Sequence, residues 1–310
     1  MHVITDPMQY EFFRNGLVVA TLVGALCGLM GVYIVLRRMS YVGHGLSHSV
    51  FGGAVVAYLM QWNFYIGAGL WGFLSALIIN FASRRRNVGA DAAIGIVTTA
   101  SFALGIALIS RQRQFTRNFD AALFGNILGV TRQDMLMIAA VLCLVVGGVF
   151  LAYRQLLFTT FDPEIARVYG VRTNWVDAGF ALALAATVVV SMKIVGVTLI
   201  AAAIVVPPST ARLVTNSFGR MLIISTLLGA FIGCAGMFVS FEFDIASGAS
   251  IVLLGTVMFS SVYVVTGAKN WWELRRQIAI QTRPSIDLQP LGSVARIHGQ
   301  PVPASEEHSA

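Results

Sequence analysis

The sequence predicts an all-α integral membrane protein, built as one polytopic bundle of about eight or nine transmembrane helices. Hydrophobic residues make up 57% of the 310 residues and charged residues only 11%, whereas a soluble globular chain carries roughly 25% charge. Apolar runs of about 20 residues, the length needed to cross a bilayer, recur along the chain. The basic residues, which set the net charge of +7, form short clusters between these runs. That pattern indicates membrane orientation and argues against a nucleic-acid partner.

Nine apolar runs are candidate spans. They cover residues 12–36, 42–60, 64–82, 90–110, 133–152, 174–192, 194–214, 220–240 and 247–267. With the N-terminus outside, most of the 21 Lys and Arg residues fall in cytoplasmic segments, as the positive-inside rule requires. We therefore expect a transmembrane domain over residues 1–267. Residues 268–310 should form a cytoplasmic C-terminal tail, largely disordered because its later part is polar and has no hydrophobic periodicity.

Two stretches of this domain depart from a regular span. Residues 118–130 are too short and too rich in Gly to cross a bilayer, so we expect a re-entrant or interfacial helix there. In the run 194–214, Gly196 lies near the start, and Pro207 and Pro208 interrupt helical hydrogen bonding. This run predicts a kinked helix, which either lines a cavity or is kinked without a functional role.

Two histidines are the strongest candidate site. His44 and His48 lie four residues apart, so they share one face of a helix and can reach the same metal ion. Ionisable side chains at bilayer depth are costly and usually face a cavity. The alternative is a pair of hydrogen-bonded histidines that hold helices together. Neither histidine is followed by the Glu of an H-E-x-x-H motif, so a zinc protease is not indicated.

A short helix is predicted between two spans. Asp162 suits the N-cap position, Pro163 the first helical position and Glu164 the first turn, and Gly170 suits the end. This helix is either a plain connector or a docking site for a soluble partner. The sequence has no phosphate-binding G-x-x-x-x-G-K-[ST] loop and no G-x-S-x-G motif, so we expect a chain that is not an enzyme.

Several segments, in order, resemble the ABC-3 permeases of zinc, manganese and iron ABC importers. Residues 35–53, from Arg37-Arg38-Met39 to His48, resemble that family's "RRM-x-x-x-G-D-x-L-(S/A)-H-(A/S)" stretch. The segments 123–125, 161–170, 195–212 and 244–249 match further family motifs. The resemblance covers residues 10–267.

The resemblance implies a multi-pass inner-membrane subunit that works with a second permease copy, either identical or related. It also implies ATP-binding cassette subunits that carry the ATP and dock on the 162–171 helix, here Asp162, Pro163, Glu164, Ala166 and Gly170. An extracytoplasmic metal-binding protein would deliver the ion. The permease itself would hold no permanent cofactor.

The resemblance also implies roles in the metal path for His44 and His48, and places Gly196 and Pro207 in a kinked pathway helix. The family usually has Asp where this chain has His44. Because imidazole suits zinc and carboxylate suits manganese, the substitution favours zinc as cargo, with manganese next.

Three alternatives remain open. The chain could be an ABC permease for a metal chelate, such as a siderophore or corrinoid, which needs a wide cavity without metal ligands. It could be an ion-coupled secondary transporter that works without an ATPase. It could also be a membrane sensor that binds metal without moving it.

Overall fold

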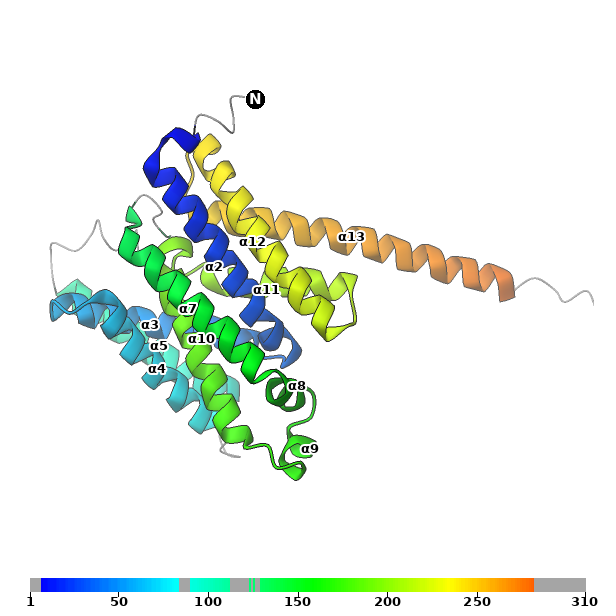
Figure 1. The fold of residues 1–310 in the computed structure, drawn as a ribbon, viewed down its shortest axis with the longest axis horizontal. Coiled ribbons are helices and arrows are strands. Elements are labelled where there is room, and N and C mark those ends of the chain that lie inside the picture. Colours follow the sequence, from blue (N-terminus) through cyan, green and yellow to red (C-terminus); the bar gives the residue numbers. More distant parts are fainter. Residues whose placement is uncertain (1–6, 84–89, 112–122, 124, 126–128, 282–310) are drawn as a thin grey trace, which may run out of the picture. The chain divides into compact units, whose positions relative to one another are not determined.

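The computed structural model describes residues 7–83, 90–111, 123, 125 and 129–281. The chain divides into two compact units, Met1–Gly267 and Ala268–Ala310. Every regular element among the described residues is helical (Figure 1). The helices are η1 Pro7–Gln9, α2 Glu11–Leu36, α3 Ser40–Leu59, α4 Phe64–Ser83, α5 Ala90–Ser110, α7 Arg132–Leu151, α8 Tyr153–Phe161, α9 Pro163–Val168, α10 Thr173–Val195, α11 Ile200–Val214, α12 Phe218–Phe243 and α13 Ser247–Gln281.

The helices confirm the predicted fold class. Within the described residues, 7 helices are long and apolar enough to cross a membrane, namely α2, α4, α5, α7, α10, α12 and α13. Two more coincide with the remaining predicted runs: α3, which carries the histidine pair, and the shorter apolar α11. The chain is therefore an all-helical, multi-pass membrane protein.

Two helix boundaries differ from the sequence prediction. The run 194–214 is not one helix, because α10 continues to Val195 and Gly196, with φ of 85°, ends it before α11 begins at Ile200. The helix α11 continues through both prolines. The helix α13 continues to Gln281. The tail was expected to begin at residue 268. Most of the expected re-entrant segment 118–130, and the tail beyond Gln281, lie outside the described residues.

Small residues bring α2 and α12 close together, side by side in Figure 1. A Cβ atom on Gly24 would lie 2.1 Å from the Gly229 carbonyl oxygen, and one on Gly28 would lie 2.3 Å from that of Ser225. The Ser225 hydroxyl donates to the Gly28 carbonyl at 2.6 Å. Gly or Ser at every fourth position lets two helix backbones approach within a membrane, where packing replaces the hydrophobic effect as the main attraction.

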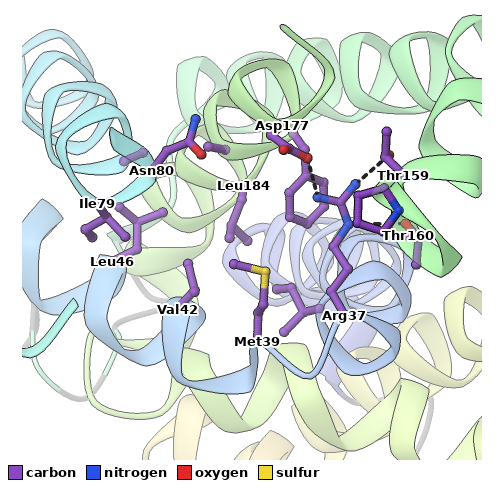
Figure 2. A pocket seen from close by; sticks show the side chains of 15 residues that line it. Arg37, Met39, Val42, Leu46, Ile79, Asn80, Thr159, Thr160, Asp177 and Leu184 are labelled. Carbon is purple, nitrogen blue, oxygen red and sulfur yellow. Dashed lines mark hydrogen bonds and ion pairs between the residues drawn. The ribbon is translucent and has the colours of Figure 1, made fainter. Parts of the chain in front are cut away.

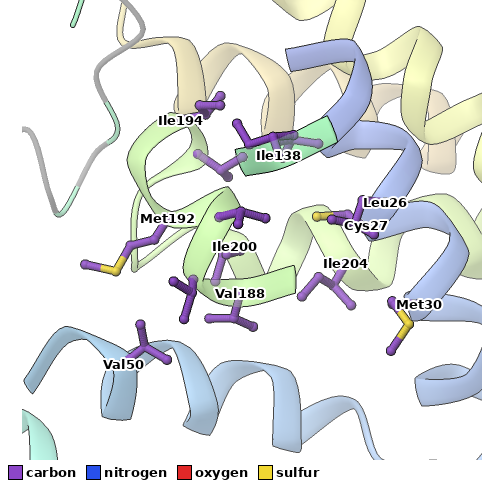
Figure 3. Packing of buried hydrophobic residues seen from close by; sticks show 14 of the residues in the cluster. Leu26, Cys27, Met30, Val50, Ile138, Val188, Met192, Ile194, Ile200 and Ile204 are labelled. Atoms are coloured by element: carbon purple, nitrogen blue, oxygen red, sulfur yellow. The ribbon is translucent and has the colours of Figure 1, made fainter. Parts of the chain in front are cut away.

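The core of the first unit forms around α2. Leu26, Cys27 and Met30 of α2 are buried, and they belong to one apolar cluster with residues of four other helices (Figure 3). The labelled partners are Val50 of α3, Ile138 of α7, Val188, Met192 and Ile194 of α10, and Ile200 and Ile204 of α11. This packing holds α3, which carries the histidines, against the centre of the bundle.

A buried ion pair joins α7 to α10. Lys193 Nζ lies 2.6 Å from Asp134 Oδ1, and only 4% of the Asp134 side chain is exposed. The Tyr65 hydroxyl of α4 also donates to this carboxylate, and Thr131 forms a reciprocal capping box with Asp134 at the start of α7. The Lys193 ammonium lies 4.9 Å from the Tyr65 ring centroid. These contacts fix the adjoining ends of α4, α7 and α10.

Candidate functional site

The structure brings His44 and His48 together on α3. Their ring centroids lie 4.7 Å apart with the rings nearly perpendicular, at 78°. Both residues are half-buried. The His48 ring also meets the Phe102 ring of α5 at 4.7 Å. The i,i+4 spacing thus places both imidazoles at one position, as the sequence predicts.

The nitrogen Nδ1 of His48 is buried and has no hydrogen-bond partner among the described residues. A buried polar atom without a partner is costly, and such atoms in native structures call for an explanation. The alternative interpretation was a pair of hydrogen-bonded histidines that hold helices together. This nitrogen does not support it, because it forms no hydrogen bond within the described part of the chain. In the tautomer protonated at Nε2, this nitrogen has the free lone pair that a metal ligand requires.

Glycines beside the histidines let neighbouring helices pack closely on α3. A Cβ atom on Gly52 would lie 2.3 Å from the Ser101 carbonyl oxygen of α5, and one on Gly53 would lie 2.2 Å from Cβ of Trp71 in α4. The helices α3, α4 and α5 therefore form a tight group (Figure 1). The two imidazoles are carried on a rigid support.

Within the described residues, no group of three or more His, Cys, Asp or Glu side chains could hold a metal ion. The part of the chain that the structure describes thus supplies two imidazole ligands from α3. Proteins bind zinc with four ligands and manganese with more, including water. Two half-exposed imidazoles can make a weak site, which suits passage better than storage.

The short helix α9 forms as its capping residues predict. The Asp162 side chain accepts hydrogen bonds from the backbone of Glu164 at 3.1 Å and of Ile165 at 2.9 Å, and Pro163 occupies the first turn. At the other end Gly170 has φ of 79°, the left-handed conformation that ends many helices. Ala166 is buried.

The outer side of α9 is apolar and exposed. Val168 is 85% exposed, Tyr169 78% and Ile165 48%, and Phe161 before the helix is 61% exposed. Exposed apolar side chains gathered on a short capped helix are typical of a protein-docking surface. This feature favours the docking interpretation over that of a plain connector.

Gly196 and Pro207 lie in other elements. Gly196 belongs to the turn between α10 and α11, where Thr198 Oγ1 donates to the Leu123 carbonyl at 2.8 Å. Pro207 is buried within α11 and lines a cavity of about 20 Å³ with residues of α2 and α12, among them Cys27 and Gly229. Thr210 donates to the Val206 carbonyl at 2.9 Å. The kinked pathway role of these residues stays a prediction.

Sequence reasoning missed a buried arginine at the end of α2. The Arg37 side chain is only 9% exposed and lies 3.0 Å from Asp177 Oδ1 of α10. It also donates to the hydroxyls of Thr159 at 3.0 Å and Thr160 at 3.2 Å, both in α8 (Figure 2). The available signal was Asp177, an acidic residue inside an apolar run, which at bilayer depth calls for a partner.

The comparisons with known proteins identify the family. The model of the ABC 3 transport family matches residues 9–266. The chain belongs to this family. It is therefore a membrane permease subunit of an ABC transporter and not a catalytic subunit, as the sequence predicts.

Similar proteins cover most of the chain. It is 37% identical over 252 residues to the manganese transport system membrane protein MntC of Listeria monocytogenes, covering 81% of this chain and 90% of that protein. It is 34% identical to the manganese import system permease protein ScaB of Streptococcus gordonii, covering 87% and 96%. Among solved structures, PsaBC from Streptococcus pneumoniae in complex with Fab matches with a TM-score of 0.80 and 32% identity, covering 88% of this chain and 99% of that one.

Proposed function

We propose that this chain is the permease subunit of an ATP-driven manganese importer. It would receive the ion from an extracytoplasmic binding protein and pass it to the cytoplasm beside His44 and His48. The observation that carries this proposal is the pair of imidazoles, 4.7 Å apart within the membrane domain, one with a buried nitrogen free of partners. The proposal gains support from relatives named for manganese that align over more than four-fifths of the chain.

Two arguments bear on the choice of metal, and they disagree. The His44 imidazole, in place of the family's usual Asp, favours zinc by ligand preference. The names of the similar proteins favour manganese. We give the relatives more weight, because affinity at a transit site does not set the cargo when a binding protein has already selected it. Zinc is the second candidate.

The remaining partners follow from the same proposal. A second permease copy would face the half-exposed histidines and supply further ligands, because two imidazoles alone do not complete a coordination shell. An ATP-binding cassette subunit would dock on the exposed apolar side of α9, formed by Ile165, Val168 and Tyr169. The ATP would be bound by that partner, and the permease would carry no resident cofactor. In the inner membrane, the C-terminus would face the cytoplasm.

The test is uptake into vesicles that hold the permease, its ATPase subunit and the binding protein. Radiolabelled manganese and zinc are supplied separately and then in competition. The proposal expects manganese uptake that requires ATP and that excess zinc inhibits only partly. Uptake of zinc alone would assign the second candidate.

The same vesicles separate the rival functions. Uptake of a ferric siderophore or a corrinoid, with no uptake of free manganese or zinc, would assign a chelate permease. Uptake driven by an ion gradient without the ATPase would assign a secondary transporter. Binding of metal without any uptake would assign a sensor. Each of these three results would refute the proposed function.

A further inference from the structure

Arg37 joins three helices at one end of the bundle. It follows directly after α2, contacts Asp177 of α10 at 3.0 Å, and donates to Thr159 and Thr160 of α8 at 3.0 and 3.2 Å (Figure 2). Its guanidinium also lies 4.6 Å from the ring centroid of Phe180 in α10. A planar group held by hydrogen bonds from three nitrogens and by a ring has little freedom to turn. We call Arg37, Thr159, Thr160 and Asp177 the clasp.

The threonines of the clasp lie just before α9, the proposed docking helix. Thr159 and Thr160 lie in the last turn of α8, and Asp162, which caps α9, follows two residues later. The Thr159 hydroxyl also donates to the Gln155 carbonyl at 2.9 Å, so this turn is itself well anchored. A displacement of α9 must therefore move the two hydroxyls that hold Arg37.

Arg37 of the clasp lies just before α3, the helix that carries the histidines. Between Arg37 and the first residue of α3, Ser40, lie only Arg38 and Met39. This turn is tight, because Arg38 has φ of 56° and the Met39 amide donates to the Ile34 carbonyl at 2.9 Å. His44 lies about one helical turn after Ser40. Few rotatable bonds therefore separate the guanidinium from the start of the histidine helix.

A cavity beside the clasp gives these helices room to move. It has a volume of about 290 Å³. Its walls include Met39 in the turn before α3, Val42 and Leu46 of α3, Ile79 of α4 and Leu184 of α10, next to Arg37 itself. Close-packed interiors resist small displacements. A cavity at this position lets the first turns of α3 and α10 shift against each other without forcing packed side chains apart.

We propose that Arg37 is a positioning residue that transmits the movement of α9 to α3 and thereby sets the position of His44 and His48. This inference rests on the proposed function, since it takes α9 as the docking helix and the histidines as the metal path. Arg37 touches no cargo in this scheme. Through Arg37, each cycle of ATP hydrolysis would move α3, the helix that carries His44 and His48.

The test measures metal uptake and ATP hydrolysis in the same vesicles, with the permease, its ATPase subunit and the binding protein present. The variants are Thr159→Val with Thr160→Val, which replaces each hydroxyl that accepts from Arg37 with a methyl group, and Asp177→Asn, which weakens the contact to α10. We expect the number of metal ions imported per ATP to fall at least about fivefold, the lower end of usual coupling between sites. ATP hydrolysis should stay near the wild-type rate.

Three further variants separate coupling from stability. Ser225→Ala removes a buried hydrogen bond between α2 and α12, so it should lower the melting temperature and leave the ratio of metal to ATP unchanged. Arg37→Met should lower the ratio, and Arg37→Lys should restore part of it because one charged donor remains. If Arg37→Met fails to assemble, the threonine and Asp177 variants still decide the question.

The outcomes distinguish this inference from the proposed function. One outcome is a wild-type ratio of metal to ATP in the threonine and Asp177 variants, with manganese uptake lost in His48→Ala. It would overturn the inference about Arg37 and leave the proposed function standing. A ratio that also falls in Ser225→Ala, so that the ratio simply follows the melting temperature across all variants, would overturn the inference as well. Normal manganese uptake in His48→Ala would refute the proposed path, and the inference about Arg37 with it.

Discussion

The close contact between α2 and α12 predicts that a single methyl group added at Gly229 lowers the melting temperature by several degrees. In Gly229→Ala, the new Cβ would lie 2.1 Å from the Gly24 carbonyl oxygen, whereas ordinary van der Waals contact begins near 3.4 Å. Backbone lines both sides of this contact, so no side chain can turn away to make room. The two helices must separate locally by about 1.3 Å, the difference between 3.4 Å and 2.1 Å.

The cost of that separation can be estimated. Overpacking of a well-packed core costs about 1–3 kcal/mol. The Ser225 hydroxyl, one turn away, would also lose its 2.6 Å bond to the Gly28 carbonyl, which adds roughly 0.5–1.5 kcal/mol. A chain of this size loses roughly 2–4 °C of melting temperature per kcal/mol. Gly229→Ala should therefore lower the melting temperature by roughly 3–18 °C.

The assay is thermal unfolding in detergent at a fixed scan rate, with Gly147→Ala as the matched control. Gly147 is also a helical glycine, but a Cβ atom there meets nothing within 4 Å, so that variant should be neutral or slightly stabilising. The double variant Gly24→Ala with Gly229→Ala should cost less than the sum of the single ones, because one separation accommodates both methyl groups. Equal melting temperatures for Gly229→Ala and Gly147→Ala would refute the close contact.

Two further predictions concern polar side chains. Lys193→Met should lower the melting temperature, since it leaves the Asp134 carboxylate buried without its cation, and adding Asp134→Asn should recover part of the loss; no recovery in the double variant would contradict this reading. Asp162→Ala should cost about 1 kcal/mol of α9 stability and speed hydrogen exchange at the amides of Glu164 and Ile165, whereas Asp162→Asn should not. Equal exchange in the alanine and asparagine variants would show that the side-chain cap does not stabilise α9.

Local signals in the sequence predicted much of this fold. Apolar run length located the spans, and the order Asp162, Pro163 and Gly170 predicted α9 with its caps, because helix ends depend on neighbouring residues. The spacing of His44 and His48 predicted a shared helical face for the same reason. All these features depend on residues only a few positions apart.

Features that depend on distant residues were not predicted. Arg37 and Asp177 are 140 positions apart, and Lys193 and Asp134 are 59 apart. Neither pair has a spacing that a single sequence would reveal. The end of α10 was misplaced because the predicted span stopped at residue 192, before the charged Lys193. The helix continues through Lys193, whose ammonium pairs with Asp134, and ends at Val195 before Gly196 with its positive φ. Hydropathy describes composition and carries no information on backbone direction.

The most direct test of the proposed path is ATP-dependent manganese uptake by the complete transporter carrying His44→Ala with His48→Ala. The matched control is His298→Ala, the same substitution outside the predicted transmembrane domain. Both proteins should assemble with the ATPase subunit, and both assembled transporters should bind ATP through that subunit. We predict that uptake falls to background in the double variant and stays at the wild-type rate in the control. Wild-type uptake in the double variant would contradict the assignment of these histidines to the path of the ion.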